Sequence, residues 1–292
     1  MQLRILGSAA GGGVPQWNCN CPNCRTARKA GSFLSQSSAA VSDDGKSWLL
    51  LNASPDLVSQ FASFPPLSPA GRNLRGSPVE AVILTDGEMD HVLGLLSLRE
   101  EKSLRLVCTA AVRDLLTRRF PLLPALGRYV RIRHSAFPFQ AAGIRISALE
   151  LPAKKSPPYS QGPARRSEVV GLRLENLRSK RKCVYIPGLP VITAELNKFV
   201  AGCDCLVVDG TFWSDREMIS LGLSRRTAAQ MGHVPISGPN GSLEWLRGLS
   251  IPRKLYTHIN NSNPILNPAS RERRMVEKAG VEISRDGMEI FL

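Results

Sequence analysis

The chain has 292 residues, of which 43% are hydrophobic and 6% aromatic, and this length lies near the upper limit for a single hydrophobic core. The formal net charge of +14 would suit nucleic acid or another acidic partner, but the basic residues are scattered and no nucleic-acid-binding motif accompanies them, which argues against nucleic acid. No run of about 18 apolar residues occurs, so no membrane-spanning helix is expected.

The first residues and the cysteines bear on the cellular compartment. Residues 1–6 are typical of a first strand and lack the long apolar region and cleavage site of a signal peptide, so a cytoplasmic protein without membrane insertion is expected. Seven cysteines are unevenly spread, and three of them fall within residues 19–24. In a reducing compartment this clustering favours metal binding over disulfide bonds.

The N-terminal segment joins a glycine-rich loop to a cysteine cluster. Residues 3–6 predict a strand, and the glycines of residues 7–13 allow the backbone to approach another group closely; no nucleotide-binding pattern is present. The cluster is Cys19, Cys21 and Cys24. Three thiolates at this spacing on a tight turn can share one tetrahedral zinc ion, with a fourth ligand from elsewhere. Free or redox-active thiols are the alternative interpretation.

Hydrophobic patterning and turn residues predict the next elements. In order, they are paired strands at residues 35–40 and 48–52, a helix opening near residue 57, a Pro/Gly-rich loop at 65–78, buried strands at 79–84 and 104–108, and a helix at 110–119.

An acidic turn lies between the strand at residues 79–84 and a helix predicted from residue 92. It contains Asp86, Glu88, Asp90 and His91. Open α/β sheets place ligand sites at the carboxyl ends of strands. Carboxylate and imidazole together suit zinc, iron or manganese. The alternative interpretation is that Asp86 and Glu88 form a solvated turn and that Asp90 caps the helix.

The second half of the chain repeats the layout. Short strands are expected from residue 130 to residue 149, and the Pro/Gly-containing loop at 154–167 is predicted to be mobile, as a lid would be. Later predicted elements are strands at 169–174, 183–186, 205–209 and 255–258, and a helix at 193–200. We assign Cys108, Cys203 and Cys205 to the core and His134 to the exposed surface.

Three later residues are candidates for a functional site. Asp209 ends a predicted strand, where it is either a turn cap or a carboxylate facing the same edge as Asp90. His233 lies in a Gly/Pro loop, and His258 ends another strand. Three of the four histidines thus occupy loop or strand-end positions.

These features together resemble the metallo-β-lactamase superfamily. They are a strand followed by a glycine loop, Asp-His before a helix, a later strand-end Asp, and a final Thr-His. Residues 7–24, 51–56, 232–238 and 257–261 more specifically resemble the PqqB family of pyrroloquinoline quinone (PQQ) biosynthesis, and the resemblance spans nearly the whole chain. It implies an α/β (α+β) fold, a four-layer αββα sandwich, formed as one domain over residues 1–292 with an N-terminal Cys-rich zinc-binding loop.

The chain departs from the hydrolytic members of that superfamily at their metal ligands. Those members carry His-x-His-x-Asp-His, and Asp86 and Glu88 stand where the two leading histidines would be. Asp90, His91 and His258 match the ligands of the second metal. A bridging aspartate of the relatives is replaced by Pro-Gly at positions 187–188, which leaves Asp209 as a candidate fourth ligand. Two histidines and one carboxylate form the facial triad of non-haem Fe(II) oxygenases.

The resemblance also implies a function. It implies an iron-dependent hydroxylase acting on the tyrosine of a small, peptide-derived Glu-Tyr unit, with Fe(II) at the active site and His233, Asp86 and Glu88 expected to be catalytic. A carrier that helps transport PQQ or its precursor to the periplasm, and a metal-dependent hydrolase, are the alternatives. Assembly as a homodimer is left open.

The cysteine cluster departs from similar phosphodiesterases as well. In those proteins a histidine three residues after the last active-site histidine completes the zinc site. Asn261 stands at that position here. The fourth ligand of the structural zinc is therefore Asn261, water or another residue.

Overall fold

The computed structural model describes residues 1–69, 71 and 74–292. Positions 70, 72 and 73 of the predicted Pro/Gly-rich loop lie outside the described residues. Within the described part of the chain, no helix has the length and apolar character needed to cross a membrane.

Two mixed seven-stranded sheets form the centre of the molecule, in the strand orders β14-β1-β2-β3-β4-β5-β6 and β13-β12-β11-β10-β9-β8-β7. The first contains β1 (Gln2–Gly7), β2 (Ser38–Ser42), β3 (Trp48–Leu51), β4 (Val79–Ile83), β5 (Ser103–Val107), β6 (Arg131–Ser135) and β14 (Glu289–Phe291). The second contains β7 (Phe139–Ala141), β8 (Ile144–Leu151), β9 (Val169–Asn176), β10 (Lys182–Ile186), β11 (Cys205–Asp209), β12 (Arg253–Thr257) and β13 (Glu282–Ile283).

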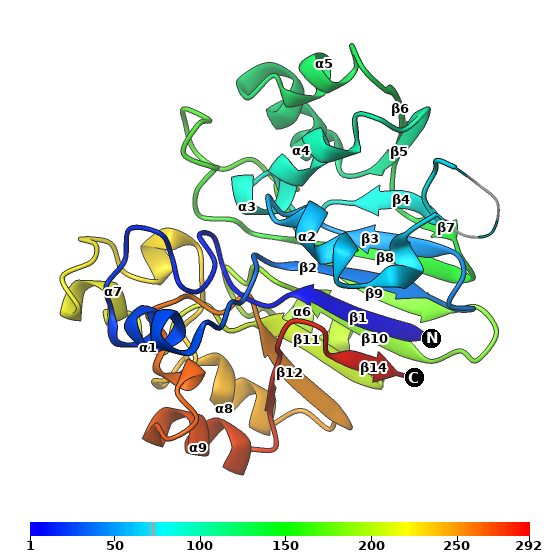
Figure 1. The fold of residues 1–292 in the computed structure, drawn as a ribbon. Coiled ribbons are helices and arrows are strands. Elements are labelled where there is room, and N and C mark those ends of the chain that lie inside the picture. Colours follow the sequence, from blue (N-terminus) through cyan, green and yellow to red (C-terminus); the bar gives the residue numbers. More distant parts are fainter. Residues whose placement is uncertain (70, 72–73) are drawn as a thin grey trace.

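The described residues form nine α-helices. They are α1 (Pro22–Ala30), α2 (Leu57–Ala62), α3 (Met89–Val92), α4 (Ala110–Asp114), α5 (Leu122–Leu126), α6 (Ala194–Val200), α7 (Glu217–Ser220), α8 (Ser242–Arg247) and α9 (Arg271–Lys278). Of these, α2 to α6, α8 and α9 pack on the outer faces of the sheets, and α1 and α7 lie at the end where the strands meet the loops. Figure 1 shows α4 and α5 above the sheets and α8 and α9 below them. The expected four-layer αββα sandwich is confirmed.

Apolar side chains pack in three layers that correspond to this arrangement. The layer between the sheets joins Leu49 and Ile83 of the first sheet to Leu172 and Val207 of the second. Two further clusters pack the outer face of each sheet against its helices. Strands that are buried on both faces read as continuous apolar runs, which is why β11 was predicted with its observed bounds, Cys205–Asp209.

Several predicted elements differ from those observed. The helix expected from residue 92 begins earlier, as α3 at Met89, and the strand expected from residue 35 begins at Ser38. Helices α1, α5, α7, α8 and α9 were not predicted. In α9 only Val276 is buried and most other residues are charged, so the apolar period is too weak to read from sequence.

The two sheets meet at one edge, where several strands end. The loop after β1 forms isolated bridges through Ala9 to Gln36 and to Ile259, which lies just beyond β12. The Val170 backbone N–H of β9 donates to the carbonyl oxygen of Thr85, just beyond β4, at 2.8 Å. Residues that follow β4, β11 and β12 are therefore brought to the same edge.

Candidate active site

The acidic turn after β4 is held by Asn52, the first residue after β3. Asn52 Oδ1 accepts a hydrogen bond from the Thr85 backbone N–H at 2.9 Å, and Asn52 Nδ2 donates to Thr85 Oγ1 at 2.9 Å. Asn52 has a φ of 60°, in the left-handed region that asparagine adopts more readily than most residues. These hydrogen bonds fix the position of Thr85, the residue that precedes Asp86 in the turn.

Asp86 determines the orientation and tautomer of His91. Both carboxylate oxygens of Asp86 lie 2.8 Å from His91 Nδ1, and both side chains are buried. Burial raises the pKa of the Asp86 carboxyl, but the adjacent His91 outweighs burial and leaves that pKa lowered. Because an ionised carboxylate only accepts hydrogen bonds, the proton of this contact sits on Nδ1. Metal-binding histidines commonly donate their other ring N–H to a carboxylate in this way.

The second nitrogen of His91 is the observation that fits a metal ion. His91 Nε2 is buried and has no hydrogen-bond partner among the described residues. Burial lowers the pKa of His91, but the carboxylates of Asp86 and Asp90 raise it to about 9. A buried polar atom without a partner is costly, and a cation that replaces the Nε2 proton would supply the missing interaction.

His258 approaches the same place from the end of β12. Its Nδ1 lies 2.7 Å from Thr211 Oγ1, and its Nε2 lies 3.1 Å from Asp90 Oδ2. His258 has a φ of 56°, and Thr211 Oγ1 also contacts the His258 carbonyl oxygen at 2.9 Å. A non-glycine residue held in the left-handed region is strained, and such strain often accompanies a functional site.

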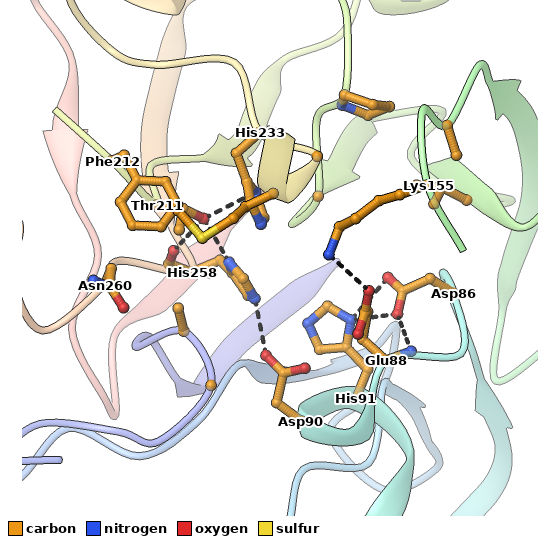
Figure 2. Close-up of a pocket in the computed structure, with 18 of the residues that line it drawn as sticks. Asp86, Glu88, Asp90, His91, Lys155, Thr211, Phe212, His233, His258 and Asn260 are labelled. Atoms are coloured by element: carbon orange, nitrogen blue, oxygen red, sulfur yellow. Dashed lines mark hydrogen bonds and ion pairs between the residues drawn. The ribbon is translucent and has the colours of Figure 1, made fainter. Parts of the chain in front are cut away.

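The three predicted ligands of the active-site metal are brought together. Asp90, His91 and His258 offer ligand atoms that all lie within 4.8 Å of one another (Figure 2). Two ligands about 2.1 Å from one ion and at right angles to each other lie about 3 Å apart, which agrees with the separation of His258 Nε2 and Asp90 Oδ2. The alternative role of Asp90 as a helix cap is wrong, because Asp90 lies inside α3 and Glu88 occupies the cap position.

Asp209 is paired with His233. Asp209 Oδ2 accepts from His233 Nδ1 at 2.6 Å and from the Leu189 backbone N–H at 2.8 Å. Asp209 Oδ1 accepts from the backbone N–H and the hydroxyl of Thr211 at 2.9 and 2.5 Å. Asp209, His233 and His258 also form a group whose ligand atoms lie within 4.8 Å. Both oxygens of Asp209 are already engaged, so its present contacts suit orientation of His233 better than direct coordination.

The charges of this pair reinforce each other. Burial raises the pKa of Asp209, but the positive charge of His233 outweighs burial and lowers it. Burial lowers the pKa of His233, but Asp209 outweighs that effect and raises it. His233 Nδ1 faces Asp209, so Nε2 is the ring nitrogen left for a ligand in the cavity.

Asp90, His91, His233 and His258 line a cavity of about 270 Å³, together with Lys155, Phe212 and Arg226. Glu88, which was expected to be catalytic, lies on the cavity wall, and its Oε1 is 3.6 Å from Lys155 Nζ. Asp86 also lines the cavity, but its carboxylate is turned toward His91. The predicted lid at 154–167 contains no helix or strand, and its Tyr159 hydroxyl donates to the Gly87 carbonyl oxygen at 2.5 Å.

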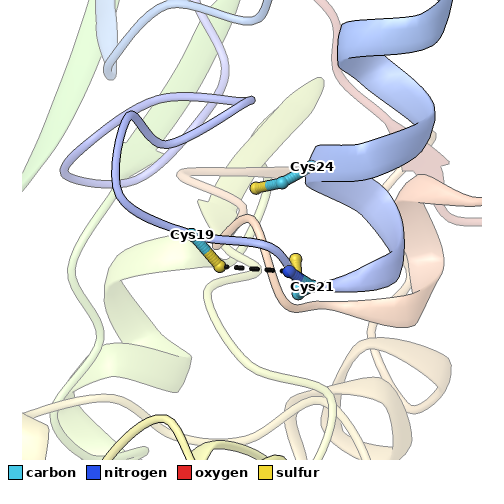
Figure 3. Close-up of side chains that lie close together, drawn as sticks. All are labelled: Cys19, Cys21 and Cys24. Atoms are coloured by element: carbon cyan, nitrogen blue, oxygen red, sulfur yellow. Dashed lines mark hydrogen bonds between the residues drawn. The ribbon is translucent and has the colours of Figure 1, made fainter.

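The cysteine cluster forms a second candidate metal site. The sulfurs of Cys19, Cys21 and Cys24 lie within 4.8 Å of one another, and all three residues are buried free cysteines (Figure 3). Asn261 Nδ2 lies 3.0, 3.6 and 3.3 Å from these sulfurs, in the same order. Rotation of the Asn261 amide by 180° would present its oxygen, which can bind a metal ion, to the three sulfurs. The residues present fit a thiolate zinc site with Asn261 at the fourth position.

Sequence reasoning missed two residues of the active site. Thr211 contacts Asp209, His233 and His258, and the only sequence signal was its place two residues after a strand-end aspartate. Lys155 was treated as part of a mobile loop, and nothing in the local pattern indicated that its side chain enters the cavity. The predicted exposed position of His134, on β6, is confirmed.

Comparison with known proteins places these observations in a family. The family model described as beta-lactamase superfamily domain matches residues 47–259. The coenzyme PQQ synthesis protein B of Azoarcus sp. (strain BH72) and that of Pseudomonas aeruginosa (strain UCBPP-PA14) are each 44% identical to this chain, and both matches cover 100% of this chain and 100% of the relative.

Solved structures agree. The crystal structure of Zn(2+)-bound PqqB from Methylobacterium extorquens has a TM-score of 0.91 and 38% identity, with 100% of both chains covered. A diphosphatase from the PhnP family has a TM-score of 0.70 and 17% identity over 99% of this chain and 96% of its own, a likeness of fold alone. The chain therefore belongs to the coenzyme PQQ synthesis protein B family, within the beta-lactamase superfamily.

Proposed function

We propose that the protein acts in PQQ biosynthesis as an Fe(II)-dependent oxygenase that hydroxylates the tyrosine of a Glu-Tyr-type precursor. Membership of the coenzyme PQQ synthesis protein B family supports a role in PQQ biosynthesis. One observation carries the chemistry: His91, whose buried Nε2 has no partner among the described residues, belongs with Asp90 and His258 to a group whose ligand atoms all lie within 4.8 Å of one another beside a cavity. Two imidazoles and one carboxylate suit non-haem Fe(II) and leave coordination positions open. When bound, the iron would supply the redox chemistry that O₂ requires.

The atoms of the reaction balance with one added reductant. One oxygen atom of O₂ forms a new C–O bond on the phenol ring and the other leaves as water. Reducing the second oxygen atom to water requires two electrons and two protons in addition to those that the substrate supplies. A two-electron donor such as ascorbate provides them. The product is a catechol.

The chain's own residues orient the ligands and hold a proton. Asp86 is a positioning residue, because it acts on the site through His91 Nδ1. Thr211 holds His258 through Nδ1, which turns Nε2 toward Asp90. His233, charged through its contact with Asp209, can exchange a proton with the substrate phenol from Nε2. We assign Asp209 to this orienting role in place of a fourth metal ligand.

Oxygen uptake tests the proposal. Active-site metal is removed, Fe(II) is loaded without oxygen, the dipeptide Glu-Tyr and ascorbate are added, and O₂ is admitted. The wild-type protein should consume O₂ and yield a dipeptide that carries one extra oxygen atom, which mass spectrometry with ¹⁸O₂ identifies. His91→Ala and His258→Ala should lose both the iron and the product, because each removes one of the clustered ligands.

His134→Ala is the matched control, since this exposed histidine lies on β6 away from the cavity. It should retain iron and turnover. Wild-type protein that is fully loaded with iron, consumes no O₂ and leaves the dipeptide unchanged would contradict the hydroxylase assignment. Tight binding of PQQ or its precursor without turnover would then favour the carrier.

A further inference from the structure

Lys155, in the loop at 154–167, lines the cavity beside Asp90, His91 and His258. Its side chain is 31% exposed, and Nζ lies 3.6 Å from Glu88 Oε1 (Figure 2). A Cβ atom built on Gly232 would lie 3.3 Å from Lys155 Cε, so the stem of the lysine packs against the backbone just before His233. Lys155 therefore lies between the loop of His233 and the acidic turn that carries two metal-ligand candidates.

Two hydrogen bonds anchor the loop around Lys155. The Ser156 hydroxyl, one residue on, donates to the buried Glu168 at 2.6 Å. Tyr159 donates to the Gly87 carbonyl oxygen at 2.5 Å, and its ring lies 5.2 Å from that of Phe120. Because its neighbours are tied to the acidic turn and to β9, Lys155 is presented to the cavity in a defined position.

The ammonium group of Lys155 has unfilled hydrogen-bonding capacity. An ammonium carries three donors, and a separation of 3.6 Å from Glu88 is an ion pair without a hydrogen bond. Among the described residues, no hydrogen-bond acceptor is within range of Lys155 Nζ. A partly buried cation with free donors, facing a cavity, is complementary to a ligand oxygen.

The charge balance of the cavity also favours an anionic ligand. Its lining contains three carboxylates, Asp86, Glu88 and Asp90, and three cations, Lys154, Lys155 and Arg226. Asp209 balances the charge of His233, and His91 and His258 are neutral when they bind a metal ion, so the remaining formal charges of the lining cancel. A divalent metal ion would leave two positive charges uncompensated, and such a cavity binds an anion more strongly than a neutral molecule.

We propose that Lys155 binds the carboxylate of the substrate's tyrosine unit, and that Glu88 is the counter-ion which Lys155 keeps while the cavity holds no substrate. The identity of the substrate rests on the proposed function. Lys155 is then a specificity-determining residue: a tyrosine with a free α-carboxylate binds, and the same tyrosine with an amidated carboxyl group, or within a longer chain, binds weakly.

Equilibrium binding tests this assignment apart from catalysis. The protein is loaded with Zn(II), which has no redox chemistry, and titrated calorimetrically with Glu-Tyr and with Glu-Tyr amide. Wild-type protein should bind the free acid about 10-fold or more tightly than the amide, as expected for a hydrogen bond between charged groups. Lys155→Met should lose most of this preference, because its binding of the acid should fall toward the affinity of wild type for the amide.

Two variants complete the test. Lys155→Arg should restore a preference for the acid, because the guanidinium keeps the charge and the donors. Lys198→Met removes the same charge from an exposed position on α6 and should keep the wild-type preference. An unchanged ratio of acid to amide binding in Lys155→Met, or a wild-type protein that binds neither ligand or both equally, would overturn the assignment.

The outcomes separate this assignment from the proposed function. A Lys155-dependent preference for the acid, with no oxygen uptake by the iron-loaded protein, contradicts the hydroxylase and supports the binding role. Oxygen uptake at equal kcat/KM with the acid and the amide supports the hydroxylase and contradicts the role of Lys155.

Discussion

The side chains of Asp209 and His233 lie 2.6 Å apart beside the candidate metal ligands, and each shifts the pKa of the other. The lowered pKa of Asp209 contributes stability above the unfolded value of about 3.9, and this is lost as pH falls through the folded pKa. The raised pKa of His233 contributes stability that is complete below about 6.5 and is lost as pH rises through the folded pKa. The pair is therefore most stabilising between these two unfolded values.

Asp209→Asn should lower the pKa of His233, because burial then acts without the opposing carboxylate. NMR titration of the imidazole resonances in metal-free protein measures this directly. Wild type should titrate above about 6.5 and the variant below it. Asp44→Asn, in the turn between β2 and β3, is the control and should leave the titration of His233 unchanged. A His233 pKa that is the same in wild type and Asp209→Asn would show that the pair does not hold the proton.

Residue types and strand ends were enough to nominate Asp90, His91 and His258, because parallel strands end at shared edges. The role of Asp209 could not be predicted from its residue type and strand-end position. A strand-end aspartate fits a ligand and an orienting group equally well, and the distinction depends on hydrogen bonds from Leu189 and Thr211 that only the folded chain supplies.

At the scale of elements, the cysteine cluster joins the N-terminal loop and α1 to the loop after β12. Cys24 lies within α1, and Asn23 Nδ2 donates to the carbonyl oxygens of Asn261 and Asn263 at 2.9 and 2.8 Å. The spacing predicted the cluster but not α1, because five residues of this short helix are polar or charged and only Cys24 and Ala27 are buried. A zinc ion at this position would therefore fix one helix to the strand end that supplies His258.

Cys21→Ser should remove about one tightly bound zinc ion per chain and lower the melting temperature, since a structural zinc site contributes to folding. Metal analysis by mass spectrometry and thermal unfolding measure the two effects. Cys108→Ser is the matched control, because Cys108 is buried outside the cluster and should leave the zinc content unchanged. Undiminished zinc in Cys21→Ser would refute the structural site.

At the scale of the whole molecule, the active site joins the two sheets. Asp90 and His91 follow β4 of the first sheet, and His258 follows β12 of the second. Asp90 and His258 are 168 residues apart in sequence, and their side chains meet at 3.1 Å. The sequence pattern predicted the two halves separately; their facing arrangement came from the family resemblance, because apolar periodicity does not specify which sheet faces which.

A metal ion at this site should therefore stabilise the whole molecule against unfolding. With free Fe(II) at about 100 times its Kd, the native state gains about 2.7 kcal/mol, since the unfolded chain does not bring the ligands together. Calorimetry under anaerobic conditions, on protein that retains zinc in the cysteine cluster, should show a higher melting temperature with Fe(II) than without it. His258→Ala should abolish the shift, because Asp90 and His91 alone leave the second sheet unlinked. His134→Ala should shift as wild type does. If His258→Ala gains as much stability from Fe(II) as wild type, the ion binds elsewhere and the two-sheet site is wrong.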